Sequence, residues 1–528
     1  MHRARFFGLI SASFLTLSLA QSAFADPPTP TNDPPRVVDL TTLRILRDKQ
    51  VITQAEYDSA VAEISASTGG QAAADANTVV VGKWSTTFYG FVEADSIVDS
   101  TQSFGDLAGN AQVQRPNPFP QPPPAIQNTY AGDHGRTQFG IRNSRFGFRL
   151  RAPESHGIRA SGLIEIDFLG SQAPIAYTSD TAYRSTENAF FTSPSLRARH
   201  AYLKLETPIV DLLFGQTWAL FGWQPVFHPN TVEIQGVPGE IYSRTPQIRI
   251  SKSLKSSAAT LDLAVALNRP AQRDSMLPVL EGGAHLAIEK WRGMKTNGAT
   301  ATQIMPAAIA VTGDARQYTV PEFAPLPTAN VNRTSWAVAA DGFFPVLPAS
   351  DTKRGNALSI SGEVATGSGF ADLYTGLTGG MQMPHVPNTT GLNPPPVYPQ
   401  NVDDGLVVFD LNGQLHPIQW TSFRVGAEYY LPGVNGHAWV SANYSRMQSA
   451  NTHDYARPDS TTLPDPQTAY FVPAAQVRDS LDWFDVNVFV DVVEPVRLGL
   501  EYANFHDHYV DGISAINHRV QLSAFFLF

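Results

Sequence analysis

Arginine is concentrated in one part of this 528-residue chain. Between residues 136 and 249 there are 12 Lys and Arg against 9 Asp and Glu, although the whole chain has a formal net charge of −10. The clustered arginines are Arg136, Arg142, Arg145, Arg149, Arg151, Arg159, Arg197, Arg199, Arg244 and Arg249. Guanidinium is permanently charged and pairs bidentately with carboxylate and phosphate groups. The cluster therefore predicts a surface that attracts small anions.

The spacing of these arginines bears on the direction in which they point. In "RTQFGIRNSRFGFRLR", Arg136 and Arg142 share one parity, whereas Arg145, Arg149 and Arg151 have the other. Successive residues of a β-strand point to opposite faces. Both sets can therefore face water only if a β-bulge, which inserts one extra residue, lies between Arg142 and Arg145.

Two questions about the cluster stay open at this stage. Arg197 and Arg199 share their parity with leucines, so either a second bulge occurs or these two arginines lie at a subunit interface. The arginines could also pair locally with Glu165, Asp167 and Asp211 and merely solvate the wall. Local pairing explains a single arginine more readily than it explains the whole cluster.

Histidines raise the question of a metal site. His506 and His508 flank Asp507 in what the sequence predicts to be an outer loop, and no third ligand is apparent. A solvated pair is the simpler interpretation, so we expect no metal site and no cofactor. No nucleophile motif, phosphate-binding loop or catalytic carboxylate pair is found, and no enzyme is predicted. A barrel hydrolase with a Ser/His pair on neighbouring strands is the remaining alternative.

Alternating strands make up most of the chain that carries these residues. In the stretch 483–491, for example, Phe484 and three valines face one way, while Asp485, Asn487 and Asp491 face the other. The apolar sets contain almost no charge and the polar sets are charged. This is the pattern of a barrel that is wetted inside and coated by lipid outside. We therefore predict an all-β fold, a transmembrane antiparallel β-barrel over residues 83–528.

Connection lengths support the same architecture. Short turns at 152–157, 431–436 and near Glu494 alternate with long loops rich in Pro, Asn, Thr and Gly. The predicted long loops are 98–135, 170–195, 219–243, 370–415 and 449–476. Outer-membrane barrels have short periplasmic turns and long external loops. Two periplasmic ends require an even strand number, and including a strand at 283–291 gives about 16, with 14 and 18 as the alternatives.

The chain end fits a closed barrel. "NHRVQLSAFFLF" alternates to its last residue, Phe528, and a free strand edge of this kind would be an aggregation hazard. We expect this strand to pair with the first one, near "KWSTTFYGFVEAD", and so to remove the edge. A terminal phenylalanine also resembles the signature that is recognised during outer-membrane barrel assembly.

The N-terminal part of the sequence predicts export and a small helical segment. Residues 1–25 have the basic start, apolar run and small-residue end of a signal peptide. A proline-rich segment follows at 26–36, then a helix-turn-helix at 37–66 with a capping box from Thr53 to Glu56, and a linker at 67–82. Two such helices bury too little to fold alone, so we expect them to associate with copies on neighbouring subunits.

Composition excludes several classes of protein. The chain has no cysteine, so neither disulfides nor thiolate metal sites are possible. Its charged residues amount to 16%, below the usual ~25% of soluble proteins. The negative net charge argues against nucleic acid as a partner. The predicted partners are outer-membrane lipid, from the barrel pattern, and small anionic solutes, from the arginine cluster.

Part of the sequence resembles a known family. The relevant segments are "NSRFGFRL", "GLIEIDFLG", "LRARHAYLKLE", "FGQTWALF" and "GVPGEIYSRTPQIRIS", all between residues 137 and 255. They are similar to the DcaP-like porins, a family of trimeric outer-membrane channels. The resemblance implies a 16-stranded homotrimer with a periplasmic helical extension and a preference for small anionic solutes such as dicarboxylates. The loops at 98–135 and 370–415 have no recognisable counterpart in the family.

These observations together predict a porin channel of the Gram-negative outer membrane. The predicted pore-lining residues are Arg136, Arg142, Arg145, Arg149, Arg151, Arg159, Arg244 and Arg249. The segment 219–243 is expected to fold inward opposite them, stiffened by Trp223 and Phe227 and held by Glu233 or Glu240 through a wall arginine. A phosphate-type pore and a general pore for small solutes are the alternatives.

Overall fold

The structure is a computed structural model that describes most of the chain from residue 78 onward. The described residues are 78–81, 83–108, 111–115, 130–170, 194–233, 236–324, 327–375, 402–403, 405–410, 412–457 and 472–528. The predicted signal peptide, the proline-rich segment and the helix-turn-helix lie outside them, as does most of the predicted linker. Within the described part, no helix is both long and apolar enough to cross a bilayer.

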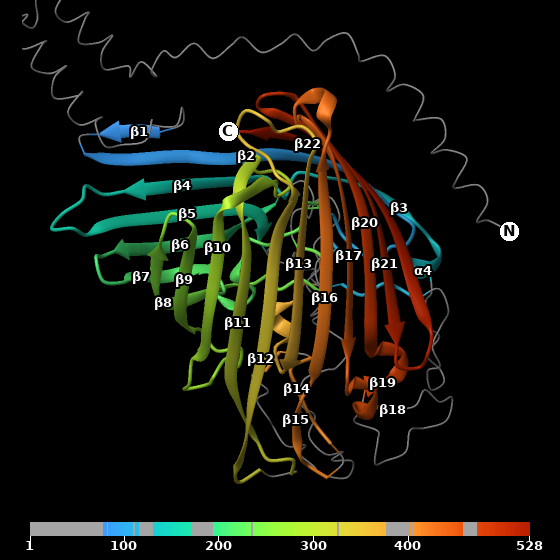
Figure 1. Ribbon diagram of the computed structural model, residues 1–528. Helices are drawn as coiled ribbons and strands as arrows, with labels where there is room; N and C mark the ends of the chain where they lie inside the picture. The colour runs from blue at the N-terminus through green and yellow to red at the C-terminus, as the bar shows by residue number, and fades with distance from the viewer. Residues whose placement is uncertain are drawn as a thin grey trace, which may run out of the picture. The chain divides into compact units, whose positions relative to one another are not determined.

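A closed antiparallel β-barrel of 16 strands forms the body of the described chain (Figure 1). Its first half contains β2 (Trp84–Asp99), β3 (Arg136–Gly140), β4 (Arg145–Arg151), β5 (Arg159–Gly170), β6 (Ser195–Glu206), β7 (Asp211–Trp218), β8 (Arg244–Lys255) and β9 (Ala259–Asn268). Its second half contains β10 (Val279–Lys295), β11 (Gln303–Pro321), β12 (Asn330–Leu347), β13 (Ala357–Ser368), β16 (Gln419–Tyr430), β17 (Ala438–Ser449), β20 (Arg478–Val493), β21 (Val496–Tyr509) and β22 (Ser514–Leu527). The elements β3 and β4 are two parts of one wall strand, so the predicted strand number is confirmed.

Several short elements lie outside the set of wall strands. They are the strand β1 (Thr78–Val81), the paired strands β14 (Val407–Phe409) and β15 (Leu415–Pro417), the paired strands β18 (Ala456–Arg457) and β19 (Val472–Pro473), the helix α4 (Tyr130–Asp133), and the 3-10 turns η2 (Phe221–Trp223), η3 (Ala371–Leu373), η4 (Pro432–Val434), η5 (Thr452–Tyr455) and η6 (Ala474–Gln476). The connections between wall strands alternate between short turns and long segments, as predicted. The described strands that border the long segments, such as β13 and β17, end on the side of the barrel opposite the C-terminus (Figure 1).

The C-terminal strand closes the barrel against the first wall strand. The β2–β22 register runs from Phe91 opposite Leu527 to Asp99 opposite Arg519, which confirms the predicted closure. The beginning of β2 extends past this pairing, and β1 covers it from Thr78 to Val81. These four residues belong to the stretch 67–82, for which the sequence predicts a linker, and that prediction is wrong for them. Three consecutive valines favour a strand, and pairing them with β2 protects an edge that would otherwise be free.

The predicted bulge between Arg142 and Arg145 is present. Asp95 of β2 lies opposite Gly140 of β3, and Phe91 lies opposite Arg145 of β4. The β3–β4 side therefore contains one residue more than the β2 side, which reverses the parity of the strand. As a result Arg142, before the bulge, and Arg145, after it, both point to the inside of the barrel.

The sequence predicts an outer loop for His506-Asp507-His508, and this prediction is wrong. The segment lies within β21. Apolar side chains such as Leu498 and Leu500 cover the outer face of this strand nearer its start, and they are exposed. The strand continues with the same alternation beyond this apolar band, which is why its polar end was mistaken for a loop.

Candidate functional site

The segment 219–243, between β7 and β8, runs through the inside of the barrel. Its backbone donates to carboxylates of the distant wall: the N–H groups of Leu220 and Phe221 lie 2.7 and 3.1 Å from Glu281 Oε2 of β10. The N–H group of Ile241 donates to Glu363 Oε1 of β13 at 2.8 Å. Irregular backbone must find acceptors when it is buried, and here the wall provides them.

The tip of the segment is held in the same way. The N–H groups of Val232 and Glu233 donate to Glu501 Oε2 of β21 at 2.8 and 2.9 Å. Glu233 also pairs with Arg519 of β22 at 3.2 Å, so a glutamate of this segment does contact a wall arginine. Burial raises the pKa of Glu233, although Arg519 opposes the shift. Glu240 instead lies 2.7 Å from His228 Nδ1.

The aromatic residues of the segment pack against the wall. Trp223 stacks on His285 of β10, with ring centroids 5.4 Å apart and an interplanar angle of 12°. Phe227 is fully buried and packs with Ala308, Ala310 and Phe343. These contacts fix the segment along β10, β11 and β12, away from β4 and β5.

A second segment enters the lumen from the opposite end. After β10 the turn 296–302 folds inward, and Lys295 pairs with Glu428 of β16 at 3.0 Å. Arg497 of β21 donates to the carbonyl groups of Gly298 and Thr300 at 2.6 and 2.7 Å. This inward turn was not among the features predicted from the sequence. The pairing of β10 with β11 shifts register between Ile288 and Arg292, and the alternation of polar and apolar residues does not reveal such a shift.

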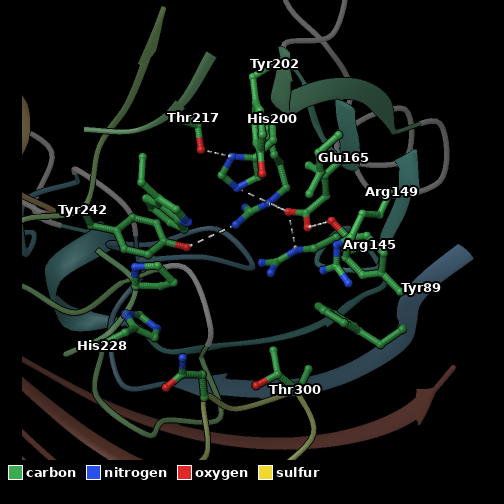
Figure 2. A pocket seen from close by; sticks show the side chains of 17 residues that line it. Tyr89, Arg145, Arg149, Glu165, His200, Tyr202, Thr217, His228, Tyr242 and Thr300 are labelled. Carbon is green, nitrogen blue, oxygen red and sulfur yellow. Dashed lines mark hydrogen bonds and ion pairs between the residues drawn. The ribbon is translucent and has the colours of Figure 1, made fainter. Parts of the chain in front are cut away.

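The two segments and the arginine-bearing wall enclose a cavity of about 340 Å³ (Figure 2). Its lining comprises Tyr89, Phe91, Arg145, Arg149, Leu163, Glu165, Arg199, His200, Tyr202, Thr217, Trp218, Pro225, His228, Tyr242, Asn297, Ala299 and Thr300. Figure 2 shows Tyr242 and His228 on one side of the cavity and Arg145, Arg149 and Glu165 on the other. Three arginines and a single carboxylate therefore line this space.

That single carboxylate, Glu165, is shared among several donors. Arg199 Nε lies 2.7 Å from Glu165 Oε1, Arg145 Nε lies 3.5 Å from the same oxygen, and the Tyr89 hydroxyl donates to Oε2 at 2.9 Å. Arg149 lies over the Tyr89 ring, with its guanidinium carbon 5.0 Å from the centroid. Arg199 also pairs with Asp167 at 3.1 Å, behind the cavity lining, so Arg149 is the lining arginine that no carboxylate of the described residues pairs with.

A second bulge brings Arg199 into the lumen. Glu165 of β5 lies opposite His200 of β6, and the next residue, Ile166, lies opposite Ala198. Arg199 is the extra residue, and both Arg199 and His200 are buried on the inner side. Of the two possibilities that the sequence left open for Arg197 and Arg199, the structure shows the bulge. It also shows the predicted local pairing at this place, because Arg197 and Arg199 lie 2.6 and 3.1 Å from Asp167 Oδ2.

Arg244 lies between this cavity and another one. Its guanidinium carbon lies 4.7 Å from the Trp218 ring centroid and 5.4 Å from that of Tyr242, and both rings line the first cavity. Arg244 also lines a cavity of about 180 Å³, together with Arg269, Arg273, Arg316 and four acidic or amide side chains, Asn268, Glu281, Asp372 and Asp403. The ends of β8 and β9 that carry this second cavity face the long loops.

The electrostatics of Tyr242 reflect its position among these cations. Burial alone favours the neutral phenol, but the guanidiniums of Arg199, Arg244 and Arg145 outweigh burial and lower the pKa of Tyr242 below its ordinary value of 10.0. Among the residues that the structure describes, no carboxylate lies within ion-pair distance of Arg149 or Arg244. The neighbourhood of Tyr242 is therefore favourable for negative charge.

The other predicted arginines occupy different places. Arg142 pairs with Asp106 at 3.0 Å, and Arg136 donates to the Phe104 carbonyl, so both contact the segment after β2. Arg249 donates to the Trp218 carbonyl at 2.6 Å. Arg151 and Arg159 flank the short turn between β4 and β5 and are exposed, outside the lining of the first cavity.

A closed antiparallel barrel with a polar interior and an inward-folded loop defines a porin-type outer-membrane β-barrel. No family model and no curated relative matches the sequence. The solved outer membrane channel DcaP of Acinetobacter baumannii is similar to this chain, with a TM-score of 0.53 and 18% sequence identity over 85% of this chain and 99% of that chain. The likeness shows the fold, and it confirms at that level the resemblance to DcaP-like porins.

Other porins are more distant in structure. The anion-selective porin from Comamonas acidovorans has a TM-score of 0.40 and 10% identity, over 84% of this chain and 100% of that chain. Salmonella typhi OmpF, solved with daunomycin, has a TM-score of 0.44 and 8% identity, over 85% of this chain and 100% of that chain.

Proposed function

We propose that this protein is an outer-membrane channel for passive diffusion of small hydrophilic solutes, with a preference for anions. The observation that carries the proposal is the pair of arginine-lined cavities with Arg244 between them. Selectivity in a pore depends on the charges at its narrowest part. Here Arg145, Arg149 and Arg199 line the first cavity against a single carboxylate, Glu165.

The arrangement suits passage and not tight binding. A small anion that leaves the second cavity meets Arg244 and then the guanidiniums of the first cavity, each of which replaces part of its hydration. Conduction requires that binding be weak enough for release. The solvent-filled volume of the first cavity, about 340 Å³, accommodates a small solute with some of its water.

We propose dicarboxylates as the preferred solutes. Two guanidiniums on one wall strand, Arg145 and Arg149, have side chains on the same face and can each face one carboxylate group of a dianion. The resemblance to DcaP-like porins points to the same class. Measuring permeation of a dicarboxylate, phosphate and a neutral sugar through the same preparation separates this proposal from a phosphate-type pore and from a general pore.

The decisive experiment replaces Arg145 and Arg149 together by alanine. We expect the anion-to-cation permeability ratio, obtained from single-channel reversal potentials, to fall by about fivefold or more, because about 1 kcal/mol of attraction corresponds to that factor. The matched control replaces the exposed Lys255 and Lys290, which removes the same charge outside the cavity. If the double arginine variant keeps the parent's selectivity while its barrel inserts normally, the anion preference does not arise from this wall.

We also propose that the channel is a homotrimer. Six phenylalanines gather at the seam of β2, β4, β5 and β22: Phe88, Phe146, Phe148, Phe168, Phe526 and Phe528. Several of them are exposed on the outer face. Contiguous exposed aromatic surface of this kind supports a contact with a neighbouring subunit.

The predicted helical segment is the second part of the trimer proposal. Deleting residues 36–70 should weaken the oligomer without closing the channel, since the barrel is complete from β2 onward. Oligomer mass in detergent and single-channel conductance measure the two effects separately. Loss of conductance in a variant whose barrel still inserts would instead identify the segment as part of the pore.

A further inference from the structure

Three side chains of the metal-binding types meet on the outer face of the wall, near the ends of β20 and β21 that face the long loops. His506 and His508 alternate along β21 with the buried Asp507, so both imidazoles lie on the outer face. Asp482 of β20 is the register partner of His506. The sequence offered no third ligand for the histidines because Asp482 belongs to a different strand.

The geometry of the three side chains is close to that of a coordination sphere. One ligand atom from each of Asp482, His506 and His508 lies within 4.8 Å of the other two. His508 Nε2 lies 3.1 Å from Asp482 Oδ2, and the two imidazole centroids are 4.0 Å apart. Ligands bound tetrahedrally to zinc at about 2.0–2.2 Å are about 3.4 Å from one another. Side-chain rotations alone can therefore bring the three ligand atoms to these separations.

Neighbouring groups already orient two of the ligands. Ser514 Oγ lies 2.9 Å from His508 Nδ1, so the nitrogen of His508 that does not face Asp482 has a polar partner. The Tyr444 hydroxyl donates to Asp482 Oδ1 at 2.7 Å. Metal-ligating histidines and carboxylates usually have such outer-shell partners, which fix the ring and the carboxylate in place.

Arg446 is the group that competes most directly for Asp482. Its Nη1 lies 3.0 Å from Oδ1 and 2.8 Å from Oδ2. An ionised carboxylate offers about four lone-pair sites, so Oδ2 can bind an ion while Oδ1 keeps its contacts with Arg446 and Tyr444. Arg446 then remains as an orienting partner.

The cluster lies on the part of the wall beyond the apolar band, where a bound ion could exchange with solvent. Phe484 and Tyr502 lie on the same outer face, nearer the middle of β20 and β21, and both are exposed. Aromatic residues mark the two boundaries of the apolar band of a barrel. The cluster lies beyond them, where Asp482 and His508 side chains are 19% and 32% exposed.

We propose that Asp482, His506 and His508 bind one divalent transition-metal ion, with Zn²⁺ as the best fit. Imidazole and carboxylate ligands suit zinc, whereas calcium and magnesium prefer oxygen ligands alone. Three protein ligands leave a position open to solvent, so the site is of the exchangeable kind. It is independent of the lumen and of the channel proposal.

The test uses the full chain, purified in detergent and stripped of metal with a chelator, and titrated with ZnCl₂ by calorimetry. We expect one ion per chain. The single variants Asp482→Asn, His506→Ala and His508→Ala should each lose affinity by about tenfold or more, since even orienting partners cost about 10–100-fold. Ser514→Ala should show a smaller loss that Ser514→Thr restores.

The matched control is His518→Ala. His518 lies on β22, where its Nδ1 is 2.9 Å from the Tyr502 hydroxyl, and it is not part of the cluster. Its removal should leave zinc affinity unchanged. In electron paramagnetic resonance with Cu²⁺, two nitrogen couplings should appear and His506→Ala should reduce them to one. The proposal is overturned if the parent shows no saturable zinc binding. It is also overturned if all three ligand variants bind zinc as tightly as the parent.

The same contacts also arrange Ser514, His508 and Asp482 in the order of a hydrolase triad. A hydrolase needs free N–H donors for an oxyanion hole. Here the backbone around the cluster belongs to the paired strands β20, β21 and β22, whose N–H groups take part in strand pairing, so the arrangement does not favour a hydrolase. Assays on a lipid ester therefore complete the test. Hydrolysis that Ser514→Ala abolishes and a chelator leaves unchanged would assign the cluster to catalysis and overturn the metal site.

Discussion

Two parts of the barrel wall carry charges of opposite sign and use them differently. On β10, β13 and β21, the carboxylates of Glu281, Glu363 and Glu501 accept hydrogen bonds from the backbone of the segment 219–243. On β4 and β8, the guanidiniums of Arg149 and Arg244 lie over aromatic rings at the edge of a cavity. These three glutamates hydrogen-bond to the backbone of the segment, whereas these two arginines lie beside a cavity.

The difference follows from hydrogen-bond chemistry. A carboxylate can only accept and a guanidinium can only donate. A loop that enters a lumen without regular structure has N–H groups that need acceptors, and wall carboxylates satisfy them. These carboxylates are turned towards the backbone of the segment, whereas Arg145, Arg149 and Arg199 line the first cavity. Basic groups can therefore gather at one place in a chain whose net charge is negative.

The largest expected effect comes from breaking the acidic anchors. Replacing Glu281 and Glu363 by alanine removes the acceptors of three backbone N–H groups. These groups belong to Leu220, Phe221 and Ile241, and leaving each of them buried without an acceptor costs about 1–3 kcal/mol of stability. The segment should then leave its place, and single-channel conductance should rise while anion preference falls.

The control for the anchor variant is Glu154→Gln, a carboxylate removed from an exposed turn. It should leave conductance unchanged. Unaltered conductance in the double variant as well would mean that packing of Phe227 and Trp223 holds the segment without these carboxylates.

A smaller effect is expected from the pH dependence of selectivity. The pKa of Tyr242 is lowered, because Arg199, Arg244 and Arg145 outweigh burial. As pH rises towards 10, the phenolate forms earlier than in an ordinary tyrosine and adds a negative charge beside the arginines. Anion preference should therefore decline with rising alkalinity in the parent and stay level in Tyr242→Phe. A parallel decline in both proteins would assign the titration to another group.

The smallest effect is expected at the mouth of the barrel. Arg159 is 67% exposed and pairs with Glu206, and Arg151 is exposed on the neighbouring strand. Exposed pairs of this kind contribute about 0–1 kcal/mol. Removing both arginines should leave reversal potentials close to those of the parent. A shift as large as that from Arg145 and Arg149 would show that the field at the mouth, and not the cavity, sets selectivity.

Much of the wall was predictable from the sequence because alternation and parity are local properties. The β-bulge after Arg142 follows from two sets of arginines with opposite parity, and the closing strand follows from an alternation that reaches the last residue. The even strand number follows from the requirement that both ends lie on one side, but that requirement does not separate 16 strands from 14 or 18. Each of these depends only on the two-residue repeat of a β-strand.

The tertiary structure alone decided which charges meet. The sequence gives no distance between Glu501 and Val232, or between Asp482 and His508, because barrel closure brings distant strands together. It predicted an inward segment, but it could not predict the inward turn at 296–302 that forms the other side of the cavity. Alternation fixes the face on which a side chain lies. Register and closure, which are non-local, determine the partner that it finds there.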